Sequence, residues 1–264
     1  MLKKLIKYDL KWSFKVVSIF LGLGFAFAVL GKLFSLIENS TVFNIISLIC
    51  NGTALSLIIS GLINCIIRSW VRIITNLYKD ESYLTHTLPI SRETHYLSKI
   101  ISFMITVLVS IIILVISLFI MYYSKNTIEL IKQSLNLISQ TLNSSVTLLI
   151  ILIVLVLLLE IIFIVFCGNF GIVLGHTYNR KKGSKSFLFG LMAYGIANAT
   201  SIMILMISSI FSKDVKDLLF GGNDKMDYSL LIVMLWGCVI LYSIYNVVLY
   251  LLTNNIFKKG INVD

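Results

Sequence analysis

The sequence predicts an all-α integral membrane protein. Of its 264 residues, 58% are hydrophobic and only 13% are charged, and the mean hydropathy is +0.96. Soluble domains typically carry about 25% charged residues. The apolar residues gather into six runs, and each run is long enough to cross a bilayer as a helix, which takes about 20 residues. The runs lack the alternation of apolar and polar residues that is typical of outer-membrane strands.

These runs predict six transmembrane spans joined by loops of different length. The predicted spans cover residues 16–37, 42–67, 98–123, 147–175, 187–211 and 229–252. Many glycines and a single proline suit helices that pack closely in lipid. We interpret the whole chain, 1–264, as one transmembrane domain, because nothing in the sequence indicates a second domain or a short internal repeat.

The first 15 residues, MLKKLIKYDLKWSFK, predict an amphipathic helix at the membrane surface. Its basic and apolar side chains fall on opposite sides of a helical wheel. The basic side holds Lys3, Lys4, Lys7, Lys11 and Lys15, and the apolar side holds Leu2, Leu5, Ile6, Leu10 and Trp12. A signal peptide cleaved near Ala26–Ala28 is the alternative. The apolar run continues past Ala28, which favours an anchored first span.

The distribution of basic residues predicts how the spans are oriented. Sixteen of the 22 Lys and Arg residues lie in segment 1–15, in the loops 68–99 and 176–186, and in the C-terminal tail, and the other six lie on the opposite side. Basic residues concentrate on the cytoplasmic side of membrane proteins. We therefore expect a multi-pass protein of the plasma membrane with both termini and loop 68–99 in the cytoplasm.

Several function classes are not expected from this sequence. The net charge of +10 is accounted for by the cytoplasmic flanks, and no stretch has the composition of a nucleic-acid-binding module. There is no GxxxxGK[ST] motif, so ATP hydrolysis by this chain is not expected, and there is no HExxH motif. A disulfide framework or a metal site is not expected either, because four cysteines lie in apolar segments without a CxxC pair: Cys50, Cys65, Cys167 and Cys238.

Polar residues inside the predicted spans are candidates for a translocation path or for interhelical hydrogen bonds. Glu160 is the only acidic residue well inside an apolar run, LIVLVLLLEIIFIVF. A carboxylate at that depth costs about 3 kcal/mol and is usually functional or paired. Two interpretations stay open: Glu160 lines a polar path or binds a cationic substrate, or it packs as a hydrogen-bonded side chain against another helix. The further candidates are Asn51, Asn64, Asn169 and Asn198.

The long polar loop 68–99 between the second and third predicted spans is the segment around which the chain is organised. It contains Pro89, the only proline. The residue before a proline avoids the α region, and Ser91 can cap a new helix with Glu93 in its first turn. The pattern therefore predicts a short helix, a sharp turn and a second helix that leads into the third span.

Apolar side chains surrounded by charges in this loop suit insertion into a groove on a partner protein. A hairpin that lies on lipid headgroups is the alternative. The residues that we expect to form the docking surface are Tyr78, Lys79, Asp80, Glu81, Tyr83, Leu84, His86, Leu88 and Pro89.

The basic N-terminal helix, the six spans and the loop YKDESYLTHTLPISRETHYLSK together resemble the permease subunit of a type-2 (ABC-2) ABC transporter from a Gram-positive bacterium. In that family an LP-hydrophobic-S motif is followed by a lysine before the next span. The matching residues here are Leu88, Pro89, Ile90, Ser91 and Lys99. The resemblance implies that the N-terminal helix is an interfacial connecting helix and that the loop carries a coupling helix.

The resemblance also implies the function and the partners. The chain would form the translocation path of an exporter, pair with itself or with a homologous permease, and bind two separate ATPase chains that hold ATP and Mg²⁺. Amphipathic drugs, antimicrobial peptides or lipids would be the substrates. Two other hypotheses are carried: a secondary transporter or channel that uses Glu160, and a membrane scaffold or sensor that moves nothing.

Overall fold

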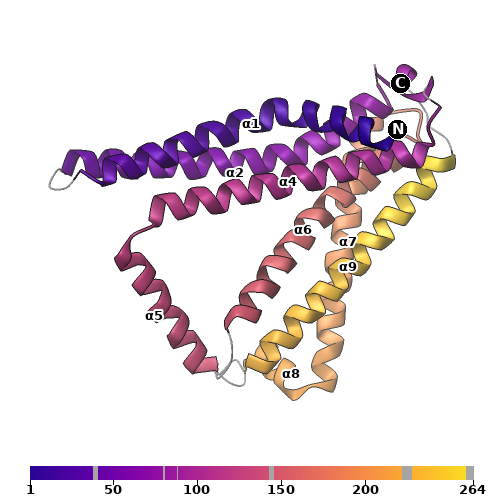
Figure 1. Ribbon diagram of the computed structural model, residues 1–264. Helices are drawn as coiled ribbons and strands as arrows, with labels where there is room; N and C mark the ends of the chain where they lie inside the picture. Colours follow the sequence, from indigo (N-terminus) through magenta and orange to yellow (C-terminus); the bar gives the residue numbers. More distant parts are fainter. Residues whose placement is uncertain (38–40, 80, 88, 143–145, 222–227, 260–264) are drawn as a thin grey trace. The chain divides into compact units, whose positions relative to one another are not determined.

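The computed structural model describes residues 1–37, 41–79, 81–87, 89–142, 146–221 and 228–259. In these ranges the chain is α-helical with short connections, and no strand is present (Figure 1). Six of the described helices are long and apolar enough to cross a membrane. The predicted all-α membrane fold with six spans is thereby confirmed.

The described residues form two compact units, one that extends to Leu130 and one that begins at Ile131. The boundary between the two units falls inside the polar helix α5. The sequence has no linker-like segment at that position, so it did not predict two units. The first unit contains α1 (Leu2–Ser35), α2 (Thr41–Leu77), α3 (Ser82–Thr87), α4 (Arg92–Tyr122) and the start of α5 (Lys125–Leu142). The second unit contains the rest of α5, α6 (Val146–Gly175), α7 (Lys182–Phe211), α8 (Lys213–Phe220) and α9 (Tyr228–Lys259).

In the first unit α1, α2 and α4 lie side by side (Figure 1). Small residues let the backbones of α1 and α2 approach each other, as is common in membrane helix pairs. A Cβ added to Gly24 would meet the Ala54 carbonyl oxygen at 3.2 Å. One turn further, Ala28 is fully buried, and the Ser47 hydroxyl donates to the Gly31 carbonyl oxygen at 2.8 Å.

Helix α1 is continuous, so the expected boundary between an interfacial helix at 1–15 and a first span from residue 16 is absent. No proline or glycine lies near that position to break the helix. At 1.5 Å per residue, the 34 residues of α1 measure about 51 Å, compared with a hydrocarbon core of about 30 Å. The N-terminal part of α1 therefore extends beyond the apolar length that one bilayer needs. Its five lysines are exposed, as the helical wheel predicted.

In the second unit α6 packs against α7 and α9 (Figure 1). Gly171 brings α6 into backbone contact with α7, where an added Cβ would meet the Gly190 nitrogen at 2.5 Å. Phe163 forms the centre of an aromatic cluster between α6, α7 and α9. The polar segment after the fifth span contains α8, which Ser212 caps at its start and which ends at Phe220, followed by the C-cap Gly221 with φ +80°.

Candidate functional site

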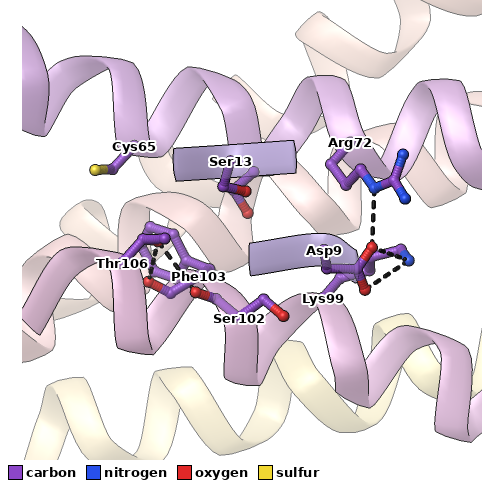
Figure 2. A pocket seen from close by; sticks show the side chains of 9 residues that line it. Asp9, Ser13, Cys65, Arg72, Lys99, Ser102, Phe103 and Thr106 are labelled. Atoms are coloured by element: carbon purple, nitrogen blue, oxygen red, sulfur yellow. Dashed lines mark hydrogen bonds and ion pairs between the residues drawn. The ribbon is translucent and has the colours of Figure 1, made fainter. Parts of the chain in front are cut away.

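A buried carboxylate, that of Asp9 on α1, joins the three long helices of the first unit. It lies near the start of α1, beside the last turns of α2 and the start of α4. Figure 2 shows Asp9 next to Arg72 and Lys99. The Lys99 ammonium on α4 donates to both Asp9 carboxylate oxygens at 2.8 Å, and the Ser98 hydroxyl donates to one of them at 2.8 Å. The Arg72 guanidinium on α2 donates from Nε to Asp9 at 2.9 Å.

The side chains of Asp9 and Lys99 are each only 2% exposed, so this ion pair is shielded from water. Removing charges from water is costly, and a buried pair is retained only where the remaining polar atoms are satisfied. Here both Asp9 oxygens have two donors each. Asp9 balances only one of the two cations that contact it, Lys99 and Arg72. Glu81 balances the other, because its Oε2 accepts from Arg72 Nη1 at 2.7 Å. The four charges sum to zero.

Glu81 extends this network from the long helices into the loop. Its Oε2 also accepts from the Asn76 amide nitrogen at 2.8 Å, and Asn76 donates to the Thr85 hydroxyl oxygen of α3 at 3.1 Å. The Thr85 hydroxyl in turn donates to the Glu81 carbonyl at 2.9 Å. The short helix α3 is therefore tied to the last turn of α2. We name Asp9, Arg72, Glu81 and Lys99 the charge clamp.

The aromatic ring of Trp12 adds a second contact between α1 and α2. The Arg68 guanidinium carbon lies 4.0 Å from the centre of the ring, and that of Arg72 lies 5.2 Å from it. Arg68 Nη2 also donates to the Trp12 carbonyl oxygen at 2.9 Å. Contacts of this kind between a cation and a ring face are favourable. They fix both arginines on the α1 side of α2.

A small polar cavity borders the charge clamp (Figure 2). Its volume is about 10 Å³, which is room for the centre of roughly one water molecule. Besides Asp9, Arg72 and Lys99, its lining consists of Ser13, Cys65, Ser69, Ser102, Phe103 and Thr106. The cavity is too small for a substrate. We therefore interpret the polar contacts of this region as a connection that holds the three helices together.

Among the predicted docking residues, two exposed side chains stand on α3. Tyr83 is 69% exposed and Leu84 is 75% exposed. Lys79 and Pro89 are exposed on either side of the short helix. Leu84 therefore lies at the surface, as expected of a docking residue, whereas Tyr78 is buried.

Of the other predicted docking residues, Glu81 accepts hydrogen bonds from Arg72 and Asn76 as described above. Tyr78 is buried, and burial together with the phenol of Tyr96 raises the pKa of Tyr78 above its ordinary value, so its hydroxyl stays protonated. His86 belongs to α3. Asp80 and Leu88 lie outside the described residues.

The cap predicted after the proline is present. The Ser91 side chain accepts from the Thr94 backbone nitrogen at 3.4 Å, and Glu93 lies in the first turn of α4. Helix α3, the turn at Pro89 and helix α4 thus form the predicted helix, turn and helix.

The predicted intramembrane residues do not gather into one path inside either unit. The amide nitrogens of Asn64 and Asn198 donate to the carbonyls of Ser60 and Tyr194 at 2.9 Å, each within its own helix. Asn51 lies against Gly31, between α2 and α1. Interhelical hydrogen bonding was an expectation for Asn64, but its amide nitrogen donates to a carbonyl in the preceding turn of its own helix, α2.

Glu160 and Asn169 lie on α6. Glu160 is half-buried and forms no hydrogen bond or ion pair with the part of the chain that the structure describes. Asn169 is 1% exposed, and neither of its side-chain amide atoms has a hydrogen-bond partner among the described residues.

The described ranges contain no group of three or more His, Cys, Asp or Glu side chains placed to hold a metal ion. The four cysteines are free.

Sequence reasoning missed the role of Asp9. The signal was its position on the apolar side of the N-terminal helical wheel, where it lies four residues before Ser13 and three after Ile6. Lys99 entered the sequence analysis through the family motif and through the count of basic residues, and Arg72 entered it only through that count. No protein-family model, no curated protein and no solved structure matches this chain.

Proposed function

We propose that the chain is the membrane-spanning permease subunit of an ATP-driven exporter of the ABC-2 type, and that α3 is its coupling helix. The observation that carries this proposal is the exposed pair Tyr83 and Leu84 on a short helix that the charge clamp connects to the long helices. A partner that displaces α3 pushes on α2 through Glu81 and Asn76. A free loop would not transmit such a displacement.

The charge clamp gives the displacement a path into the bundle. Arg72 is bonded both to Glu81 at the loop and to Asp9 on α1, and Asp9 is bonded to Lys99 on α4. Motion of α3 would therefore move the ends of α1, α2 and α4 together. Switching between arrangements open to one side or the other by rigid-body motion is a common transport mechanism.

The rest of the proposed assembly follows from the family resemblance. Two separate ATPase chains bind ATP and Mg²⁺ on the cytoplasmic side, and a second permease, identical or homologous, completes the translocation path. The excess of Lys and Arg on the side of loop 68–99 supports a cytoplasmic position for α3. Export of an amphipathic substrate is part of this proposal.

The test is a pull-down of the tagged protein from its own host in mild detergent, with partners identified by mass spectrometry. We expect a stoichiometric soluble ATPase with a P-loop. Leu84→Glu should abolish its recovery, because a carboxylate replaces an apolar contact. The matched control Leu130→Glu, at an exposed leucine of α5, should leave it unchanged. Equal recovery with Leu84→Glu would contradict the docking assignment.

A second candidate is a secondary transporter that uses Glu160. It is favoured by the position of this carboxylate in the middle of α6 without a bonding partner among the described residues. A preparation that contains no ATPase, together with proton flux into liposomes that Glu160→Gln abolishes, would support this candidate over the exporter.

A further inference from the structure

An apolar groove of the first unit lies between α1 and α4 and shares no residue with the charge clamp. Its volume is about 370 Å³, which is within the range of roughly 300–1,000 Å³ that sites for small molecules occupy. Its lining comes from α1, with one residue of α4, and consists of Phe14, Ser18, Leu21, Gly22, Phe25 and Ile113. We name it the α1–α4 groove.

The α1–α4 groove presents hydrocarbon and almost no hydrogen-bonding group. Among its lining residues only Ser18 has a polar side chain, and that hydroxyl donates to the Phe14 carbonyl oxygen of its own helix at 2.6 Å. At Gly22 the groove is open, because a Cβ added there would meet nothing within 4 Å. A polar group that entered the groove would lose its hydration without gaining a partner. The part of an occupant that lies in the groove is therefore apolar.

The groove has the length of one leaflet of a bilayer. It follows α1 from Phe14 to Phe25, which is about 16 Å at 1.5 Å per residue. Half of a hydrocarbon core of about 30 Å is about 15 Å. The apolar run of α1 begins directly after Lys15. The groove therefore starts where the apolar run starts and extends to about the middle of the membrane.

Two lysines lie at the N-terminal end of the groove. Spacings of three and four place side chains on one face of a helix, and this face of α1 carries Lys11, Phe14, Ser18, Gly22 and Phe25. Lys15, three residues before Ser18, borders the same face, and both lysine side chains are exposed. Neither has a carboxylate partner among the described residues. The carboxylate of Asp9, two residues before Lys11, is bound to Arg72 and Lys99 instead.

An apolar groove with two uncompensated cations at its end is complementary to a molecule that has a hydrocarbon chain and an anionic head. The bilayer itself contains such molecules, because its anionic phospholipids carry both parts. Lysine side chains near the end of a spanning helix extend to the level of the headgroups, where they attract anionic lipid. An apolar helix of another chain would fill the groove but leave both lysines without a counter-ion.

We propose that the α1–α4 groove binds an anionic phospholipid, with an acyl chain along Phe14–Phe25 and the phosphate at Lys11 and Lys15. A lipid bound there contacts both α1 and α4, so it should stabilise the first unit according to its occupancy. Binding needs neither ATP nor a partner chain, and it does not depend on the proposed exporter.

The experiment is native mass spectrometry of the purified full-length protein in detergent, titrated with dioleoylphosphatidylglycerol. We expect the first lipid to bind roughly tenfold more tightly than dioleoylphosphatidylcholine, which has the same chains but no net charge. Glycerol 3-phosphate, an anionic head without chains, should not displace the bound lipid. Equal affinity for the two lipids would indicate partition into apolar surface, and displacement by glycerol 3-phosphate would indicate an anion site without the groove. Either result would overturn the proposal.

A pair of lysine variants tests the headgroup contact. Lys11→Gln with Lys15→Gln should weaken phosphatidylglycerol binding by roughly tenfold or more and leave phosphatidylcholine binding unchanged, because two cations beside the phosphate are lost. Lys11→Arg with Lys15→Arg should retain the binding. The matched control is Lys213→Gln with Lys216→Gln, at two exposed lysines of α8, which should bind as the unmodified protein does. Equal affinity in the Lys11 and Lys15 glutamine variant would refute the headgroup contact.

A glycine variant tests the acyl-chain contact without altering a charge. Gly22→Leu places a side chain in the open space of the groove and should weaken phosphatidylglycerol binding by roughly threefold to tenfold, because part of the chain loses its apolar contact. The matched control is Gly52→Leu on α2, where an added Cβ also meets nothing within 4 Å. Equal affinity in these two variants would refute the groove. If Gly22→Leu does not give a monodisperse protein, the lysine variants and the comparison of the two lipids decide the question.

Discussion

Asp9 and Lys99 lie 90 residues apart in the sequence, yet the Lys99 ammonium donates to both carboxylate oxygens of Asp9 at 2.8 Å. The pair links the beginning of α1 to the beginning of α4, and Arg72 adds the end of α2. A single buried acid thus holds the three long helices of the first unit together next to the loop that carries α3.

Replacing Asp9 should be among the most damaging single changes in the first unit. Asp9→Asn leaves the Lys99 ammonium buried without its counter-ion, and breaking a buried pair in this way costs about 3–5 kcal/mol. We expect a lower unfolding temperature by fluorescence-detected size exclusion in detergent. Lys7→Gln, at an exposed position two residues away, should have no measurable effect.

The double variant Asp9→Asn with Lys99→Met should recover part of the lost stability, because it removes the uncompensated cation as well. A single variant Asp9→Asn as stable as the unmodified protein would show that the clamp does not contribute.

Replacing Glu81 should have a local effect. Its side chain is 46% exposed, and ion pairs with that much solvent contribute about 1 kcal/mol or less. Glu81→Gln should therefore leave the unfolding temperature nearly unchanged while it loosens α3 from α2. Faster hydrogen exchange confined to Ser82–Thr87 is the expected measurement, and exchange that rises equally throughout the first unit would contradict it.

Two glycines in the second unit should respond differently to the same substitution. At Gly171 an added Cβ meets backbone atoms of α7, including the Gly190 nitrogen at 2.5 Å, so Gly171→Ala forces the two helices apart. Overpacking of this kind costs about 1–3 kcal/mol. At Gly195 nothing lies within 4 Å, and Gly195→Ala should be neutral or stabilise the helix by about 0.5–1 kcal/mol. Thermal stability in detergent distinguishes the two, and equal effects would contradict the close α6–α7 contact.

The orientation predicted from Lys and Arg can be tested by labelling single cysteines in a variant without the native ones. A cysteine at the exposed Thr87 should react with a membrane-impermeant maleimide only after cells are opened. A cysteine at the exposed Asn126, beyond the other end of α4, should react in intact cells. The reverse pattern would place loop 68–99 outside the cell and exclude a cytoplasmic ATPase as its partner.

The sequence by itself determined the class of fold and the local elements. Hydrophobic length specifies a spanning helix, because lipid leaves the backbone no hydrogen-bond partner outside its own helix. The turn at Pro89 and the cap at Ser91 were also predictable, since both depend on residues that are close in the chain. The exposure of the five N-terminal lysines followed from the helical period alone.

Only the tertiary structure decided which of those helices touch and through which polar atoms. In the sequence, Asp9 is one acidic residue among lysines, and Arg72 and Lys99 are basic residues that flank spans. Their pairing could not be predicted, because residues 63 or 90 positions apart form no local sequence pattern. The sequence also did not predict that α1 continues through residue 15 or that Gly171 makes a backbone contact. Both depend on how helices pack in three dimensions. Periodicity shows that a face is buried, whereas the partner on that face depends on how closely specific small residues let two helices approach.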